Sequence, residues 1–283
     1  MAQRTYGIDF GTSTIKICRK GQGIVLDERN MIAIADRNSI IAIGNEAYDM
    51  YEKAPANIVV SNPVRSGVIA DVSNMTALLV HFMMKLSGGK KPGTADYIVA
   101  TPTDITEVER RSFYELISRS SLKVGRVKIV DKPVADALGA GLEIMTARGV
   151  MIVDIGADTT EVSILSLGGI VLSKLIPIGG NKLDESIKGM VKKKHNLYIG
   201  DKTAENIKKQ LASALPTVEA SVQVYGRDVV TGLPVLMEIH SSTVYEAIAE
   251  HLYSIVDAIR IILERTPPEI ASDIIDSGLY VTG

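Results

Sequence analysis

The sequence contains one short pattern twice, at residues 8–14 (Ile-Asp-Phe-Gly-Thr-Ser-Thr) and at residues 153–160 (Val-Asp-Ile-Gly-Ala-Asp-Thr-Thr). In each copy an apolar, β-rich run ends in an Asp, the chain turns through Gly and small polar residues, and a second apolar run follows. One copy alone is weak evidence, because Asp-x-Gly also occurs in unrelated hairpins. The two copies open the two halves of the chain, which indicates a duplicated fold with its ligand held between the halves.

The two predicted hairpin tips have the composition of a phosphate-binding site. Gly and small side chains let backbone N–H groups and hydroxyls approach an anion. Asp9 and Asp154, each at the end of the incoming strand, can hold a hydrated Mg²⁺ beside that anion. The pattern therefore favours the phosphate chain of a nucleotide as the ligand.

Composition limits the class of protein. A chain of 283 residues with 46% apolar residues can bury substantial cores, and we expect two domains. The net charge of −2 gives no reason to expect a nucleic-acid surface. The single cysteine, Cys18, excludes an intrachain disulfide and fits a reducing cytosol. The first residues lack the apolar stretch of a secretory signal, and no apolar segment is long enough to span a bilayer, so we expect a cytoplasmic location.

Strand and helix patterns alternate along the first half. Thr106 and Glu109 have the spacing of a helix capping box, and Pro133 suits the first turn of a later helix. Gly139 and Gly141 inside that later helix favour close packing against a sheet, although a nucleotide or a hinge would explain them too. The predicted strands are 6–9, 15–19, 24–27, 97–100 and 128–130, and the predicted helices are 75–86, 106–118 and 133–143.

The second half continues with a strand at 170–178 and then a segment, 181–240, that has the pattern of an inserted subdomain. A long helix at 244–264 follows that segment, and a short helix and a strand at 279–282 complete the chain. Within the inserted segment we predict helices at 183–194 and 203–214 and strands at 218–224 and 236–239.

Several motifs resemble the MreB/Mbl family of bacterial actin homologues. The hairpins alone indicate only the wider superfamily of actins, Hsp70 chaperones and sugar kinases. The Gly-Arg-Asp…Gly-Leu-Pro loop at 226–234 is far more specific to MreB-like proteins. Similar segments lie at 106–111, 166–171 and 264–269, so that the resemblance covers nearly the whole chain.

The resemblance implies an α/β, actin-like (ribonuclease H-like, duplicated) fold with a nucleotide cleft between two domains. The first domain is expected at 1–144, with a small subdomain at about 30–66. The second is expected at 145–283, with an inserted subdomain at about 181–241. Since relatives continue beyond Gly283, we expect the second domain to be truncated. The implied function is a cell-shape-determining protein that binds ATP and Mg²⁺ and forms filaments that guide cell-wall synthesis.

The resemblance also implies roles for individual residues. Asp9 and Asp154 would hold Mg²⁺ through water, with Asp154 and Thr159 taking part in catalysis. Lys16 resembles the phosphate-contacting Lys of actin, but its strand position fits an exposed residue equally well. Glu205 and Lys208 match the ribose and adenine contacts, and their alternative is a solvent-exposed helical ion pair. The implied nucleotide-binding residues are Gly11, Thr12, Ser13, Thr14, Lys16, Gly156, Ala157, Asp158, Thr159, Thr160, Glu205, Lys208 and Gly283.

Two positions depart from the family pattern. Lys132 stands where the family has the Glu that positions the attacking water, and Asp158 stands where the family has Gly. An ammonium with a pKa of about 10.4 accepts no proton near neutral pH, so we predict a weak ATPase at most. Our hypothesis is that Lys132 and Asp158 neutralise each other beside the γ-phosphate; the alternative is that each points to solvent.

Partners and alternative functions follow from the same resemblance. We expect self-association, the cell-wall elongation machinery as partner, and no nucleic acid. The few residues before the first strand are too short for an amphipathic helix. The basic loop at 87–93 predicts weak attraction to anionic lipid, and thus peripheral membrane contact. The alternatives are a non-hydrolysing paralogue that scaffolds or regulates other shape filaments, and a sugar or acetate kinase of the superfamily.

Overall fold

The computed structural model describes residues 4–36 and 39–283, and the chain divides into two compact units. The first unit comprises Met1–Gly156, Glu161–Leu175 and Thr266–Gly283, and the second comprises Ala157–Thr160 and Ile176–Arg265. These units are defined by packing, whereas the expected domains at 1–144 and 145–283 are defined by duplication. The division into domains at 1–144 and 145–283 stays a prediction. The expected first domain at 1–144 and its subdomain at about 30–66 include residues 1–3 and 37–38, which lie outside the described residues.

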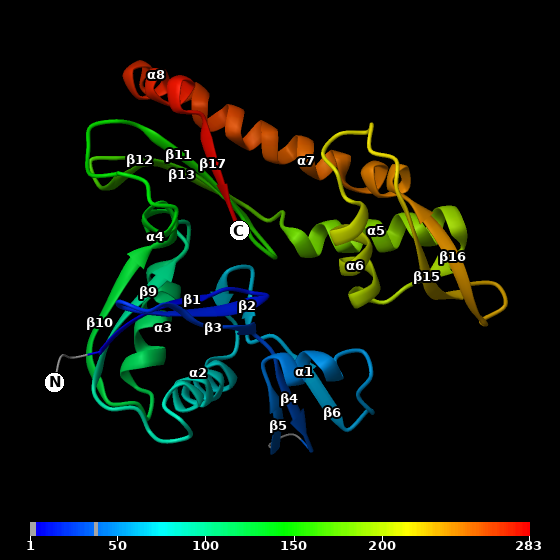
Figure 1. Cartoon of the computed structure of the whole chain (residues 1–283), viewed down its shortest axis with the longest axis horizontal. Helices are drawn as coiled ribbons and strands as arrows, with labels where there is room; N and C mark the ends of the chain where they lie inside the picture. The colour runs from blue at the N-terminus through cyan, green and yellow to red at the C-terminus, as the bar shows by residue number, and fades with distance from the viewer. Residues whose placement is uncertain (1–3, 37–38) are drawn as a thin grey trace. The chain divides into compact units, whose positions relative to one another are not determined.

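The first unit contains a five-stranded sheet that carries the first Asp-x-Gly hairpin (Figure 1). Strand β1 pairs antiparallel with β2 to form the hairpin and parallel with β9, which in turn pairs parallel with β10. Helices α2 and α3 contribute to the same buried cluster as β1, β2 and β9. The strand order is β10 (Val124–Asp131), β9 (Ala95–Thr101), β1 (Arg4–Phe10), β2 (Thr14–Arg19) and β3 (Gly23–Arg29), and the helices are α2 (Val72–Leu86) and α3 (Glu107–Ser118).

Alternation along the hairpin decides which side chains reach the core. Ile8 and Phe10 of β1 are buried, as are Ile15 and Ile17 of β2, because successive residues of a strand face opposite sides of the sheet. Asp9 lies between the buried residues of β1. The hairpin therefore turns its apolar face to α2 and α3 and keeps Asp9 on the other face.

The start of α3 has the predicted capping box. The Thr106 side chain accepts a hydrogen bond from the Glu109 backbone N–H, and the Glu109 carboxylate accepts one from the Thr106 backbone N–H. Both bonds satisfy donors that a helix start leaves unpaired. The helix predicted at 106–118 is confirmed.

A small α/β subdomain follows the first three strands. It has its own three-stranded sheet and its own buried cluster, in which Met31, Ala33, Ala42 and Ala47 pack together. Its position along the chain agrees with the subdomain expected at about 30–66. Its elements are β4 (Ile32–Ala35), β5 (Ser39–Ile43), α1 (Asn45–Met50) and β6 (Ile58–Ser61), followed by the short pair β7 (Val64–Arg65) and β8 (Val68–Ile69).

The second Asp-x-Gly pattern lies between two strands of a four-stranded sheet, whose order is β13-β12-β11-β17. Helix α4 packs on this sheet through Ala137, which shares a buried cluster with Ile152 and Leu165. The elements are α4 (Lys132–Gly139), β11 (Val150–Ile155), β12 (Thr160–Ser166), β13 (Gly169–Ile176), α8 (Pro268–Ser277) and β17 (Leu279–Thr282).

Helix α4 is shorter than the sequence predicts. It ends at Gly139, because Gly141 adopts a φ of +75° and its N–H bonds to the Leu138 carbonyl. A left-handed Gly just past a helix end is a common C-terminal cap. A Cβ built on Gly139 or Gly141 meets no atom within 4 Å. The prediction that these glycines pack closely against the sheet was wrong.

The second unit contains the helices and strands of the segment expected to form an inserted subdomain, whose bounds stay a prediction. Three strands form a sheet in the order β14-β15-β16, and Ile187, Ile207, Ile239 and Val244 lie in one buried cluster. Helices and strands occur where we predicted them, with ends that differ by a few residues. The elements are α5 (Gly180–His195), β14 (Leu197–Tyr198), α6 (Asp201–Leu211), β15 (Ser221–Asp228), β16 (Pro234–His240) and α7 (Ser241–Glu264). Within the described residues, every helix is too short or too polar to cross a membrane.

Candidate functional site

The first hairpin tip is held in place by two asparagine side chains. Asn30, which is 0% exposed, donates from Nδ2 to the Gly11 carbonyl at 2.7 Å. Asn62 donates from Nδ2 to the Thr12 carbonyl at 3.0 Å. Buried amides that satisfy tip carbonyls fix the course of the backbone. Neither residue was predicted from the sequence; the available signal for Asn30 was its place directly before the apolar run at 31–35.

Lys16 lies on the same face of the hairpin as Asp9. The two residues are directly opposite each other in the register of β1 and β2, and Lys16 donates from Nζ to the Thr14 hydroxyl at 3.1 Å. Lys16 is half-buried. Its place beside the tip favours a phosphate contact over a solvent-exposed position, and that role stays a prediction.

Lys132 begins helix α4, directly after the edge strand β10. Pro133 takes the first turn, where a missing N–H costs no hydrogen bond. The Lys132 ammonium lies 2.8 Å from Oδ2 of Asp154, and the two side chains are 21% and 8% exposed. Lys132 therefore forms a nearly buried ion pair with the Asp of the second hairpin pattern.

The aspartates of both repeated patterns act on this one ammonium. Burial lowers the pKa of Lys132, but the negative charges of Asp9 and Asp154 and the hydrogen bond to Asp154 outweigh burial and raise it above its ordinary value. Lys132 is thus positively charged at neutral pH. Both aspartates belong to the first unit, and a ligand site shared by the two patterns stays a prediction.

Asp136 adds a further carboxyl one helical turn after Lys132. Burial raises the pKa of Asp136 to about 7; the charges of Asp154, Asp9 and Glu161 add to this effect, and Lys132 opposes it. Its Oδ2 atom is buried and has no hydrogen-bond partner within the described residues. Asp136 was not predicted as a site residue, although its four-residue spacing from Lys132 was the available signal.

Glu161 is a buried carboxyl that follows the second pattern. It is 3% exposed and accepts hydrogen bonds from the Thr103 backbone N–H at 3.0 Å, from the Thr103 hydroxyl and from the Ser173 hydroxyl at 3.2 Å. Burial raises the pKa of Glu161, and these hydrogen bonds oppose the rise. Glu161 links β12 to the loop after β9. A charged residue inside the apolar run at 160–165 was a signal that the sequence analysis did not use.

The second hairpin tip is held by residues of the second unit. The Thr160 hydroxyl donates to the Ile178 carbonyl at 2.7 Å, and Asn181 donates from Nδ2 to Asp158 at 2.7 Å. The observed ion partner of Lys132 is Asp154, and Asp158 receives a hydrogen bond from Asn181. Because Lys132 and Asp158 belong to different units, their mutual neutralisation stays a prediction.

Two glycines lie against the second pattern. A Cβ on Gly179 would lie 2.6 Å from the Ala157 carbonyl oxygen and 2.7 Å from the carbonyl carbon of Asp158. A Cβ on Gly283 would lie 2.2 Å from the Ile155 carbonyl oxygen. Real Cβ atoms do not approach backbone atoms so closely, so both positions require glycine in this conformation.

Glu205 and Lys208 lie on α6 but do not pair with each other in the described contacts. Lys208 donates from Nζ to Oδ2 of Asp184 at 2.7 Å and to the Gly180 carbonyl at 2.8 Å, which joins α6 to α5. Glu205 accepts from Lys209 at 2.7 Å. The alternative to nucleotide contact was a helical ion pair. Glu205 forms such a pair, but with Lys209 and not with Lys208. Contact of Glu205 and Lys208 with ribose and adenine stays a prediction.

The geometry around Asp154 does not fit the expected magnesium site well. Magnesium keeps several waters and requires carboxylate oxygens that face them. Oδ2 of Asp154 is occupied by the Lys132 ammonium, and Oδ1 accepts from the Thr282 hydroxyl at 3.4 Å. Among the described residues, no group of three His, Cys, Asp or Glu side chains is arranged to hold a metal ion. A cation of the protein itself already neutralises this carboxylate.

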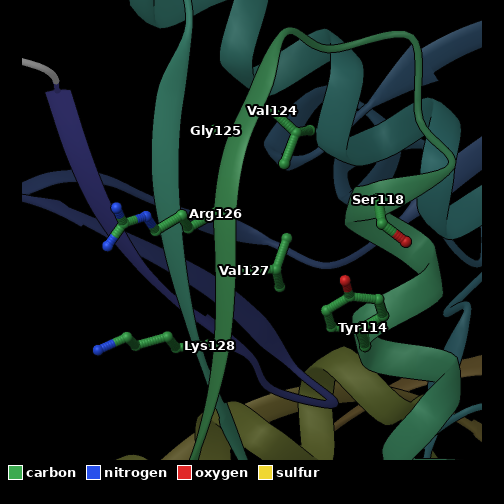
Figure 2. A pocket seen from close by; sticks show the side chains of 7 residues that line it. All are labelled: Tyr114, Ser118, Val124, Gly125, Arg126, Val127 and Lys128. Carbon is green, nitrogen blue, oxygen red and sulfur yellow. The ribbon is translucent and has the colours of Figure 1, made fainter.

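A cavity of about 500 Å³ lies in the first unit between α3 and β10 (Figure 2). Val124 and Val127 turn toward α3, whereas Arg126 and Lys128 point to the other side of the strand, as Figure 2 shows. The lining residues are Tyr114, Ser118 and Val124–Lys128. None of the predicted site residues lines this cavity, so it is separate from the cluster around Lys132.

Comparison with known proteins decides the family. The sequence model of the family described as MreB/Mbl protein matches residues 3–283. The chain belongs to the MreB/Mbl family. It is 40% identical to the cell shape-determining protein Mbl of Bacillus subtilis (strain 168), over 100% of this chain and 85% of that protein. It is 39% identical to the cell shape-determining protein MreB of Escherichia coli (strain K12), over 100% of this chain and 83% of that protein.

Solved structures agree on the fold. The MreB 5 protein of Spiroplasma citri bound to AMPPNP is similar with a TM-score of 0.93 and 35% identity, over 99% of this chain and 84% of that one. A structure of the same protein bound to ADP has a TM-score of 0.92. The MamK double helical filament, at 20% identity and a TM-score of 0.79, supports the fold alone. The predicted α/β, actin-like fold of this MreB/Mbl family member is confirmed.

Proposed function

We propose that this chain binds ATP, assembles into filaments as a cell-shape protein, and hydrolyses ATP slowly. Membership of the MreB/Mbl family and similarity to a relative solved with AMPPNP and with ADP support nucleotide binding. The observation that carries the slow hydrolysis is the nearly buried ion pair between Lys132 and Asp154. By the family resemblance, Lys132 stands where a Glu positions the attacking water.

The chemistry of hydrolysis explains why Lys132 matters. The water that attacks the γ-phosphate needs a group that orients it and accepts its proton. The charges of Asp9 and Asp154 raise the pKa of Lys132, so that the side chain stays an ammonium and accepts no proton. Asp136 is a carboxyl in the same cluster, but it comes one helical turn later and leaves the Lys132 position without a base.

Self-association and surface contacts follow from the family. Filament formation is the property that membership of the MreB/Mbl family favours for this chain. We further propose contact with the cell-wall elongation machinery and a cytoplasmic location. The loop after α2 exposes Lys90 and Lys91, which would allow weak contact with anionic lipid at the membrane surface.

The Lys132–Asp154 ion pair also favours a second candidate. A family member that holds ATP without cleaving it could scaffold or regulate filaments built from an active relative. Such a protein would sediment only when it is mixed with that active relative. Family membership over residues 3–283 leaves no observation in favour of a sugar or acetate kinase.

Sedimentation and phosphate release, measured on the same samples, test the proposal. We expect the wild-type protein to pellet in the presence of ATP and to release phosphate slowly. Lys132→Glu restores a water-positioning carboxylate, and we expect it to release phosphate at least about tenfold faster, since a positioned acid–base group contributes about 10²–10⁴-fold. Lys123→Glu, which makes the same charge change at an exposed position, should behave like wild type.

Two outcomes decide between the candidates. Wild-type phosphate release as fast as that of Lys132→Glu would contradict slow hydrolysis. Wild-type protein that pellets only together with an active relative would favour the scaffolding candidate. If Lys132→Glu fails to fold, Lys132→Gln serves in its place, because an amide can orient water without adding a charge to the carboxyl cluster.

A further inference from the structure

The Lys132 ammonium contacts one of the two carboxylates that are expected to hold a hydrated Mg²⁺. It is 2.8 Å from Oδ2 of Asp154 and is attracted by Asp9, the equivalent residue of the other repeated pattern. Both carboxylates belong to the sequence patterns that point to a phosphate ligand. The first unit thus supplies a positive charge of its own, the Lys132 ammonium, beside Asp154.

The charge of the two repeated aspartates explains why a second cation is less needed. Asp9 and Asp154 together carry two negative charges, and the Lys132 ammonium neutralises one of them. A divalent cation is attracted less by the remaining charge and is repelled by the ammonium. Since Lys132 and Asp154 are shielded from solvent, salt screens these effects little.

An ammonium is also suited to bind phosphate directly. It has three N–H donors, and the bond to Asp154 uses one of them. The others can donate to phosphate oxygens, for which lysine is a common partner in proteins. Lys132 can therefore keep its ion pair and contact a phosphate at the same time.

We propose that Lys132 is a built-in cation of the phosphate site, so that this chain binds nucleoside di- and triphosphates without Mg²⁺. The proposal rests on the proposed nucleotide binding and goes beyond it, because it concerns the metal requirement of that binding. It also explains why the Asp154 carboxylate fits a magnesium site poorly here.

Nucleotide titrations in two buffers test the proposal. The full chain is titrated with ADP and with the non-hydrolysable analogue AMPPNP by isothermal titration calorimetry, once with excess Mg²⁺ and once with excess EDTA. For the wild-type protein we expect the two Kd values to agree within about threefold, which is less than 1 kcal/mol. Lys123→Met, which removes one positive charge at an exposed position, is the matched control for Lys132→Met below and should give the wild-type ratio.

Variants at Lys132 show whether its charge is responsible. Lys132→Met keeps the length of the side chain and removes the charge. We expect its Kd in EDTA to be at least about tenfold weaker than in Mg²⁺. Lys132→Arg keeps the charge and should restore binding in EDTA. Circular dichroism of each variant confirms that it is folded before it is titrated.

The possible results separate this proposal from the proposed function. Wild-type binding in Mg²⁺ but not in EDTA would overturn the built-in cation and leave nucleotide binding intact. Binding of Lys132→Met in EDTA with wild-type affinity would overturn it as well. Absence of wild-type binding in both buffers would instead contradict the proposed function.

Discussion

Lys132 lies in a nearly buried ion pair beside a group of carboxyls. Its ion pair with Asp154 is made at the start of a helix whose next turn carries Asp136. A buried pair of this kind adds little net stability, but removal of one partner is strongly destabilising because it leaves an uncompensated buried charge. Lys132 and Asp136 thus form a unit in which each substitution changes the environment of the other.

Asp136 should make stability depend on pH. Burial, with the charge of Asp154 next, raises its pKa from 3.8 in the unfolded chain to about 7 in the folded protein. Between these values the folded state holds a proton that the unfolded state has lost, so the free energy of unfolding falls as pH rises through this window. Asp136→Asn removes the titrating group. We expect wild type to lose on the order of 1 to 2 kcal/mol more than this variant between about pH 5 and pH 8, after allowance for partial exposure.

Urea denaturation at several pH values measures this difference. Asp104→Asn, at an exposed position of the same unit, is the control and should keep the wild-type slope. Glu161 contributes a similar trend to all three proteins, since burial raises its pKa too. Parallel pH profiles for wild type and Asp136→Asn would show that Asp136 is ionised throughout, contrary to this account.

At the scale of elements, the two polar tips are held by hydrogen bonds from neighbouring segments. Asn30 fixes the first tip, and the start of α5 fixes the second through Asn181. Both arrangements depend on partners that lie outside the repeated patterns. Close backbone packing at Gly179 adds to the second arrangement, because α5 begins directly beside Ala157.

Substitution at Gly179 should displace the second tip. The Cβ of Gly179→Ala would meet backbone atoms that can move only with the loop, and overpacking of this kind costs about 1–3 kcal/mol. We expect lower stability in thermal denaturation and weaker nucleotide binding. Gly139→Ala is a matched control, because its Cβ meets no atom within 4 Å and Ala favours the helix. Wild-type stability and affinity in Gly179→Ala would show that the tip does not need this close approach.

For the whole molecule, the duplicated pattern predicted a duplicated fold, and the family resemblance implied the α/β, actin-like architecture that the solved structures confirm. The charges of Asp9 and Asp154 both act on Lys132, in keeping with their matching places in the two patterns. The ion pair of Lys132 with Asp154 was not predicted, since the sequence does not give the path of a long side chain between strand and helix. Helix α4 ended early because Gly141 adopts a left-handed conformation, which composition alone does not reveal. The burial of Glu161 was not predicted, because its hydrogen bond comes from Thr103, in a loop that is distant in sequence.

The fate of bound ATP tests the central claim most directly. The wild-type protein is mixed with an equal amount of ATP labelled at the γ-phosphate, separated from free nucleotide after a fixed time, and quenched. This account predicts that the label stays with the protein as intact ATP, while Lys132→Glu converts its bound ATP to ADP over the same time. Recovery of ADP from the wild-type protein, or of no bound nucleotide, would contradict it.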